Sequence, residues 1–176
     1  GALDKGHIHT GWVATVGDHY EKVVMAMSEH FNPCGPGLTN DIDGCYFFDA
    51  LTGKPVDFNV LPGNGYDFDP IDVNGDGYSE FVGVNGSAHA GEIFDRFGKL
   101  IGKVPGCLFR LGKIIEAPGE QFMVTVSATH VSIYGDADAA DGEIIRKRYA
   151  YPYLNFMQKM MATGYNSAGA HVSCGL

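Results

Sequence analysis

The stretch "DVNGDGYSE", Asp72–Glu80, gathers acidic and amide side chains around two glycines. Counted from the first residue as position 1, side-chain oxygens fall at positions 1, 3, 5 and 9, which are Asp72, Asn74, Asp76 and Glu80. Gly77 stands at position 6, where a sharp turn is needed, and the Tyr78 carbonyl is available at position 7. This order of hard oxygen ligands opens a calcium-binding loop.

Mostly negative oxygens crowded into nine residues repel one another unless a cation neutralises them. A large, flexible oxygen set favours Ca²⁺ over Mg²⁺, and the absence of His and Cys from the loop disfavours zinc. Gly83 replaces the Glu that a helix-loop-helix site needs at position 12, and the flanking "FDPI" and "EFVGV" have strand character. We therefore expect a structural Ca²⁺ site in a strand-loop-strand unit, with a polar turn without metal as the alternative.

Short apolar runs separated by turns fill most of the remaining chain, which predicts an all-β fold. "YFFDALTGKPVDF" and "EIFDRFGKLIGKV" each combine an aromatic strand, an Asp, a Gly-Lys turn and a second strand. Asp49 and Asp95 in these copies are 46 residues apart, about the length of one four-stranded β-propeller blade. We predict β-propeller blades at about residues 7–58, 59–104 and 105–135, followed by a closing segment over residues 136–176.

Apolar residues at near-helical spacing in Pro152–Asn166 predict one short C-terminal helix within the closing segment. Propeller rings usually contain 4–8 blades. Residues 1–176 therefore form a single propeller domain that is a small ring, or a part of a larger ring that another chain completes. The chain begins at Gly1 with neither a methionine nor a charged-then-apolar leader, so we expect it to be processed or cut from a longer protein.

A net charge of −9 argues against nucleic acid and anionic membranes as partners. No apolar run reaches the ~20 residues that span a bilayer. The one basic run is "IIRKRY", Ile144–Tyr149, which we interpret as a solvated surface strand, with contact to an anionic sugar as the alternative. The four cysteines fit two disulfides, Cys34 with Cys45 and Cys107 with Cys174, better than they fit a zinc site. Disulfides indicate a secreted, extracellular protein. Four reduced thiols are the alternative.

The run "PGNGYDFDPIDVNGDGYSEFVGV" resembles the FG-GAP class of calcium-binding propeller blades and, more narrowly, the rhamnogalacturonan lyases built on a calcium-laden β-propeller. The segment "SIYGDADA…YPYLNFMQKMMATGYNSAGAHVSCGL" resembles the closing segment of that lyase family. Together the two runs cover about a third of the chain. The resemblance implies a C-terminal portion, or a reduced relative, of a lyase that cleaves acidic polysaccharide by β-elimination.

Such a lyase needs a base, and a positive charge that offsets the uronate carboxylate. We expect the base among His7, His9 and Tyr165, and substrate contacts from Asn166, His171, Arg146 and Arg148, with Lys147 as a further positive side chain. The alternatives are surface or transition-metal-binding roles for the two N-terminal histidines, and packing for the tyrosine. His89 and His130 fit turn and strand positions.

Two further functions stay open at this point. The same blades can form a carbohydrate-binding, lectin-like module without chemistry. They can also form an adhesion-type propeller segment that binds protein partners.

Overall fold

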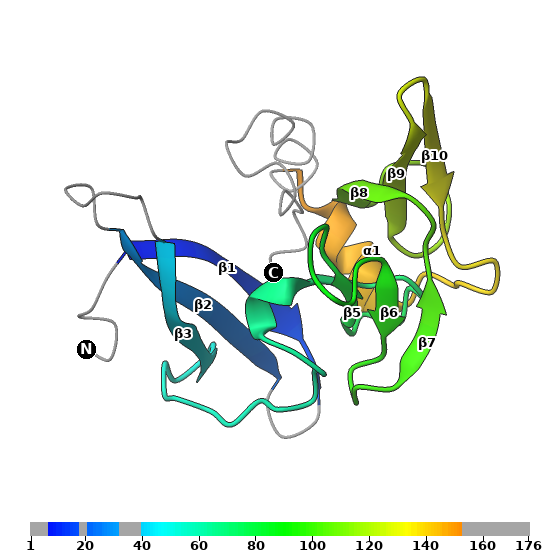
Figure 1. Ribbon diagram of the computed structural model, residues 1–176. Coiled ribbons are helices and arrows are strands. Elements are labelled where there is room, and N and C mark those ends of the chain that lie inside the picture. Colours follow the sequence, from blue (N-terminus) through cyan, green and yellow to red (C-terminus); the bar gives the residue numbers. More distant parts are fainter. Residues whose placement is uncertain (1–6, 18–20, 32–39, 153–176) are drawn as a thin grey trace.

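The computed structural model describes residues 7–17, 21–31 and 40–152, and these form a mostly β structure with three small antiparallel sheets (Figure 1). The N-terminal sheet has the order β1-β2-β3: His7–Thr15, Lys22–Phe31 and Asn40–Asp49. The central sheet has the order β4-β5-β6-β7: Phe68–Ile71, Glu80–Gly83, Glu92–Phe94 and Leu100–Lys103. The C-terminal sheet has the order β8-β9-β10: Cys107–Gly112, Gln121–Ser127 and His130–Tyr134.

Two helical elements complete the described residues: a single 3₁₀ turn, η1, at Gly65–Asp67 and one α-helix, α1, at Glu143–Ala150. Within the described ranges the sheets close into neither a barrel nor a propeller ring. No helix in this part of the chain could cross a membrane.

Strands β4, β5 and β6 of the central sheet are largely buried on both faces, whereas the edge strand β7 is mostly exposed. Successive residues on the buried strands alternate between two cores, as the period of two in a β-strand requires. Phe81 and Phe94 enter a core shared with the N-terminal sheet, where Trp12 and Met25 lie. Val82 and Ile93 enter a second core, shared with the C-terminal sheet. The three sheets are therefore stacked face to face, with the central sheet between the other two (Figure 1).

The two similar hairpin segments build the same kind of turn. Asp49 Oδ1 accepts hydrogen bonds from the backbone N–H groups of Leu51 and Thr52, and Asp95 Oδ1 accepts them from Phe97 and Lys99. The copies then differ, because the second strand expected after the first turn is reduced to one bridge between Phe48 and Pro55. Proline has no N–H to continue a ladder.

The structure corrects the interpretation of the basic run Ile144–Tyr149, which lies in helix α1 and not in a surface strand. Ile145 and Arg148 are three residues apart and both buried, so the run has one buried helical face. Glu143 in the first turn and Lys147 in the last form an ion pair of 2.7 Å and complement the helix dipole. Of the helix expected at Pro152–Asn166, all but the first residue lies outside the described residues.

Phe81→Ala is expected to lower the free energy of unfolding by about 3–5 kcal/mol, because it opens a cavity in the first core. Phe81 is fully buried, and its ring centroid lies 5.5 Å from that of Trp12, the chain's only tryptophan. Urea unfolding followed by tryptophan fluorescence measures the effect. Phe97→Ala is the matched control, since that ring is 61% exposed, and it should change stability by less than about 0.5 kcal/mol. Equal losses in both variants would contradict this core.

Candidate functional site

The Asp72–Glu80 loop connects β4 to β5, and both of the expected flanking strands are confirmed. Its side chains differ in depth: Asp72 is fully buried and Glu80 is 4% exposed, whereas Asp76 is exposed and Asn74 and Tyr78 are half-buried. The acidic side chains of the loop therefore lie at different depths, from the protein interior to the solvent-exposed surface.

Side-chain oxygens of the loop accept hydrogen bonds from its own backbone. Asp72 Oδ1 accepts from Gly75 N at 2.9 Å, and Asp72 Oδ2 accepts from Gly77 N at 3.0 Å. Asn74 Oδ1, Asp76 Oδ1 and Glu80 Oε2 accept from the N–H groups of Asp76, Tyr78 and Val73. These bonds fix where each carboxylate lies, and because an ionised carboxylate has about four lone-pair positions, its oxygens retain acceptor capacity.

Two further carboxylate oxygens, one from Asp76 and one from Glu80, accept hydrogen bonds from the Asn74 side-chain amide. The Asn74 amide nitrogen lies 3.1 Å from Glu80 Oε1 and 3.4 Å from Asp76 Oδ2. Three ligand side chains expected from the sequence therefore face one another across the loop. Among the described residues, no three His, Cys, Asp or Glu side chains are grouped so that they could hold a metal by themselves. A metal here would need the amide and a backbone carbonyl as well.

Sequence reasoning missed three residues that complete the site: Glu120, Arg148 in its role here, and Tyr149. Arg148 Nη1 lies 3.6 Å from Asp72 Oδ2 and 3.8 Å from Glu120 Oε1, while its Nη2 donates to the Gly77 carbonyl at 3.2 Å. Glu120 Oε2 accepts from Asp72 N at 2.8 Å, and Glu120 Oε1 accepts from the Tyr149 hydroxyl. Arg148 was expected to face an anionic sugar, but its side chain is 2% exposed and is engaged with the loop.

Burial shifts the pKa values of these groups. Desolvation, and then the neighbouring Glu120 charge, raise the pKa of Asp72 to about 7, although Arg148 opposes the shift. Desolvation raises the pKa of Glu80 to about 8, with Asp72 and Asp76 adding to the shift and the Val73 N–H opposing it. Burial and the adjacent Glu120 also raise the pKa of Tyr149. Without a further cation, both loop carboxyls therefore retain protons to a higher pH than an ordinary carboxyl does.

Two glycines allow helix α1 and the segment before it to approach the loop. Gly75 and Gly77 have φ values of +82° and +97°, in the left-handed region that side chains disfavour. A Cβ on Gly77 would lie 2.5 Å from Ile144 Cβ, and one on Gly75 would lie 2.8 Å from the Ala140 carbonyl. Both glycines therefore serve the turn and the docking of the helix.

The loop is also bonded to the N-terminal sheet. Ser79 N donates to the Thr15 carbonyl at 2.7 Å, and Thr15 N donates to Ser79 Oγ at 3.0 Å. Glu120, which directly precedes β9, joins the loop to the C-terminal sheet, and Arg148 joins it to α1.

The other predicted site residues are not brought together by the described structure. Arg146 is exposed on α1, and the backbones of His7 and His9 lie on β1, but their side chains are outside the description. Tyr165, Asn166 and His171 lie outside the described residues. His89 Nδ1 lies 2.9 Å from Glu92 Oε2 and its ring stacks on Phe68, while His130 begins β10.

The cysteine pairings stay predictions. Cys45 lies half-buried on β3 and forms no disulfide with another described residue, and burial raises the pKa of its thiol. Its expected partner Cys34, and Cys174, lie outside the described residues, and the side chain of Cys107 is likewise not described.

Comparison of the chain with family models, with curated proteins and with solved structures finds no match.

Arg148→Ala is expected to lower the free energy of unfolding by about 3–5 kcal/mol, because it leaves buried carboxylates without their cation. Denaturant unfolding of the full chain at pH 7 measures the loss. Arg146→Ala is the control, since it removes the same side chain from the exposed face of the same helix and should change stability by less than about 0.5 kcal/mol. A small effect of Arg148→Ala would show that the buried network contributes little to stability.

The free energy of unfolding in chelator is expected to fall as pH rises from 5 to 8. The raised pKa values of Asp72, about 7, and Glu80, about 8, mean that the folded chain retains protons which the unfolded chain has released. The contribution of these two carboxyls to the free energy of unfolding is complete below the ordinary carboxyl pKa, which applies to the unfolded chain. It is lost as the pH rises through the raised pKa values of the folded chain. Urea unfolding at several pH values tests this, and Glu80→Gln should flatten the curve. A rise in stability over the same range would contradict it.

Proposed function

We propose that this chain is a secreted, calcium-binding protein of β-propeller type that acts on an acidic polysaccharide by β-elimination. The observation that carries the calcium part is that Asp76 Oδ2 and Glu80 Oε1 both lie within 3.4 Å of the Asn74 side-chain amide, in the loop that also holds the buried Asp72. The ligands would be Asp72, Asn74, Asp76, the Tyr78 carbonyl and Glu80. The raised carboxyl pKa values support this part, because groups that hold protons at neutral pH are groups from which a divalent ion can displace them.

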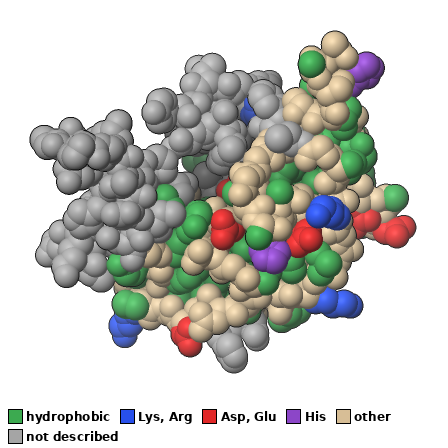
Figure 2. Space-filling model, viewed as in Figure 1, with side chains coloured by type: hydrophobic (Ala, Val, Ile, Leu, Met, Phe, Trp, Pro, Cys, Tyr) green, Lys and Arg blue, Asp and Glu red, His purple; other side chains and the backbone are tan. Residues whose placement is uncertain are grey.

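The stacking of the sheets supports the propeller part. Each sheet is an antiparallel meander, and the central one packs through both faces, as blades inside a propeller do. The outer face of the C-terminal sheet exposes Val131 and Ile133, and Figure 2 shows hydrophobic side chains over the β9–β10 hairpin. A further blade from another chain, or from a longer form of this one, would cover that face.

The resemblance to the rhamnogalacturonan lyases motivates the catalytic part. In this proposal the base comes from His7, His9 or Tyr165, and Arg146 offsets the uronate charge, with Asn166 and His171 as further contacts. Arg148 would act indirectly, by holding the loop against α1.

A carbohydrate-binding module without chemistry is the second candidate. The burial of Arg148 favours it, because one of the two arginines expected to face the uronate is withdrawn from solvent.

Addition of Ca²⁺ to chelator-treated protein is expected to raise the melting temperature, because an ion that binds only the folded loop stabilises it by mass action. At a hundred times the dissociation constant the gain is about 2.7 kcal/mol. Differential scanning calorimetry measures it. Asp76→Ala should abolish most of the gain, whereas Asp138→Ala, an exposed acidic residue outside the loop, should retain it. Identical melting curves in chelator and in Ca²⁺ would rule out the metal site.

Incubation with uronic-acid polymers in Ca²⁺ is expected to raise ultraviolet absorbance as β-elimination creates unsaturated ends. Polymer binding measured on the same protein separates the two candidates. Binding without any rise in absorbance would favour the binding module. If the protein neither binds the polymers nor raises the absorbance, both candidates are excluded.

A further inference from the structure

The N-terminal sheet has an apolar outer face. The run Val23–Met27 of β2 is continuously apolar, which is typical of a strand with apolar side chains on both of its faces. One set alternates into the first core, where Met25 lies. The other set points to the outer face, where two cross-strand rows occupy the middle of the sheet: Val13, Val24 and Phe48, and Gly11, Ala26 and Tyr46. Neither row contains a charged residue, although a sheet face that meets only water is usually polar.

The C-terminal sheet has a similar outer face, at the opposite end of the stack of sheets (Figure 1). Val124 of β9 is buried in the second core, so its neighbours Met123 and Thr125 point to the outer face. Their cross-strand partners on β10 are Ile133 and Val131, which are 40% and 58% exposed. Each end of the three-sheet stack therefore presents apolar side chains.

The exposed apolar side chains of β7 are placed differently. Leu100 and Ile101 are 52% and 49% exposed, but Lys99 and Lys103 lie beside them at the two ends of the strand. Lysines of this kind are the usual protection of an exposed strand against association with another chain. The two rows of the N-terminal face, and β10 on the C-terminal face, contain no lysine, arginine or carboxylate. This contrast indicates that the two end faces meet a further apolar surface.

The borders of the two end faces are complementary in charge and shape. Arg110 of β8 is the cross-strand partner of Met123, so it lies on the C-terminal outer face. At the β3 edge of the N-terminal sheet, a hollow of about 390 Å³ is lined by Tyr46, Phe48 and the exposed Asp57. An apolar hairpin beside a guanidinium suits a hollow that is bordered by a carboxylate. A copy of the same face offers no opposite charge in either case, so the contact joins unlike faces.

A second copy of this chain supplies both of the surfaces that these faces need. In a pair with head-to-tail contacts, each N-terminal face meets the C-terminal face of the other copy, and all four end faces are covered. Unlike faces that meet in this way form either a closed ring or an open filament. Three sheets from each of two copies make six, which is within the 4–8 blades that close a propeller. Because the net charge of −9 makes two copies repel one another, contact through uncharged faces is favoured.

We propose that two copies of this chain pack head to tail through the outer faces of their N-terminal and C-terminal sheets and form a closed ring of six sheets. Val24 and Ile133 lie within each of the two contacts, and Arg110 of each copy lies beside the Asp57 border of the other. The inference rests on the propeller part of the proposed function, and it is independent of the calcium and catalytic parts.

Size-exclusion chromatography with light scattering on the 176-residue chain tests the proposal. The mass should be twice the 18.9 kDa of one chain. Val24→Lys and Ile133→Glu each place an unpaired charge in both contacts, and each should weaken dimerisation at least about a hundredfold. Ile101→Glu is the matched control, since it adds the same charge to an exposed apolar position outside both faces, and it should leave the dimer intact.

An equimolar mixture of the two face variants tests the head-to-tail arrangement. In a mixed pair, one contact holds both introduced charges, which are opposite in sign, and the other contact is unaltered. Dimers should therefore reappear in the mixture, although neither variant forms them alone. Urea unfolding shows first that each variant is folded, and Ala26→Lys, in the neighbouring row, replaces Val24→Lys if that variant does not fold.

Four results would overturn the proposal: a monomeric chain, an open filament, a dimer that survives either face variant, or a mixture that stays monomeric. A monomer would mean that the end faces are covered by something other than a second copy. A separate Ca²⁺ titration of the same samples distinguishes this inference from the metal site. A monomer that binds Ca²⁺ removes this inference alone, and a dimer that passes the mixing test without binding Ca²⁺ removes the metal site alone.

Discussion

Three carboxylates and one guanidinium buried at one place constrain the rest of this structure. Asp72, Glu80, Glu120 and Arg148 are each 5% exposed or less, although isolated buried charges cost several kcal/mol. The structure meets that cost by pairing. The carboxylates accept bonds from the backbone N–H groups of Val73, Gly75, Gly77 and Asp72, and from the Tyr149 hydroxyl, while the guanidinium lies between two of the carboxylates. The contacts of Glu120 and Arg148 with Asp72 join elements that are distant in sequence, whereas the bonds to Gly75, Gly77 and Val73 lie within the loop.

The balance of charge at this place connects the fold to the calcium site that we propose. One guanidinium cannot neutralise three ionised carboxylates, so the excess must be removed by protons or by a second cation. The raised pKa values of Asp72 and Glu80 represent the first outcome, and the Ca²⁺ that we propose would be the second. In that proposal protons and metal compete for the same oxygens, which would couple the stability of the three sheets to the occupant of the loop.

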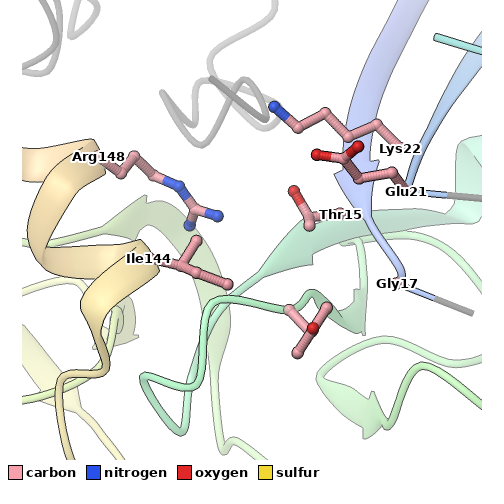
Figure 3. Close-up of a pocket in the computed structure, with 7 residues that line it drawn as sticks. Thr15, Gly17, Glu21, Lys22, Ile144 and Arg148 are labelled. Carbon is pink, nitrogen blue, oxygen red and sulfur yellow. The ribbon is translucent and has the colours of Figure 1, made fainter. Parts of the chain in front are cut away.

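Tyr78 connects the loop to a cavity that lies between the β1–β2 end and α1 and is also lined by Thr15, Lys22 and Ile144 (Figure 3). Its backbone carbonyl is at the ligand position of the loop, and its side chain lines the cavity under Arg96. Arg148 has the same double position, with Nη1 near Asp72 and the guanidinium at the cavity wall.

The sequence by itself determined those features of the fold that arise from residues close together along the chain. The strands that flank the loop, the glycines at its turn, the mostly β character and the aspartate-capped turns at Asp49 and Asp95 all follow from short-range patterns. Only the tertiary structure decided what depends on distant residues. Glu120 and Tyr149 carry no local signal, since 48 residues separate Glu120 from Asp72, and the basic run at Ile144–Tyr149 became a helix because Ile145 and Arg148 are buried together against the rest of the fold. Local patterns specify turns and strands through backbone geometry, whereas a buried charge must find its partner wherever packing brings one.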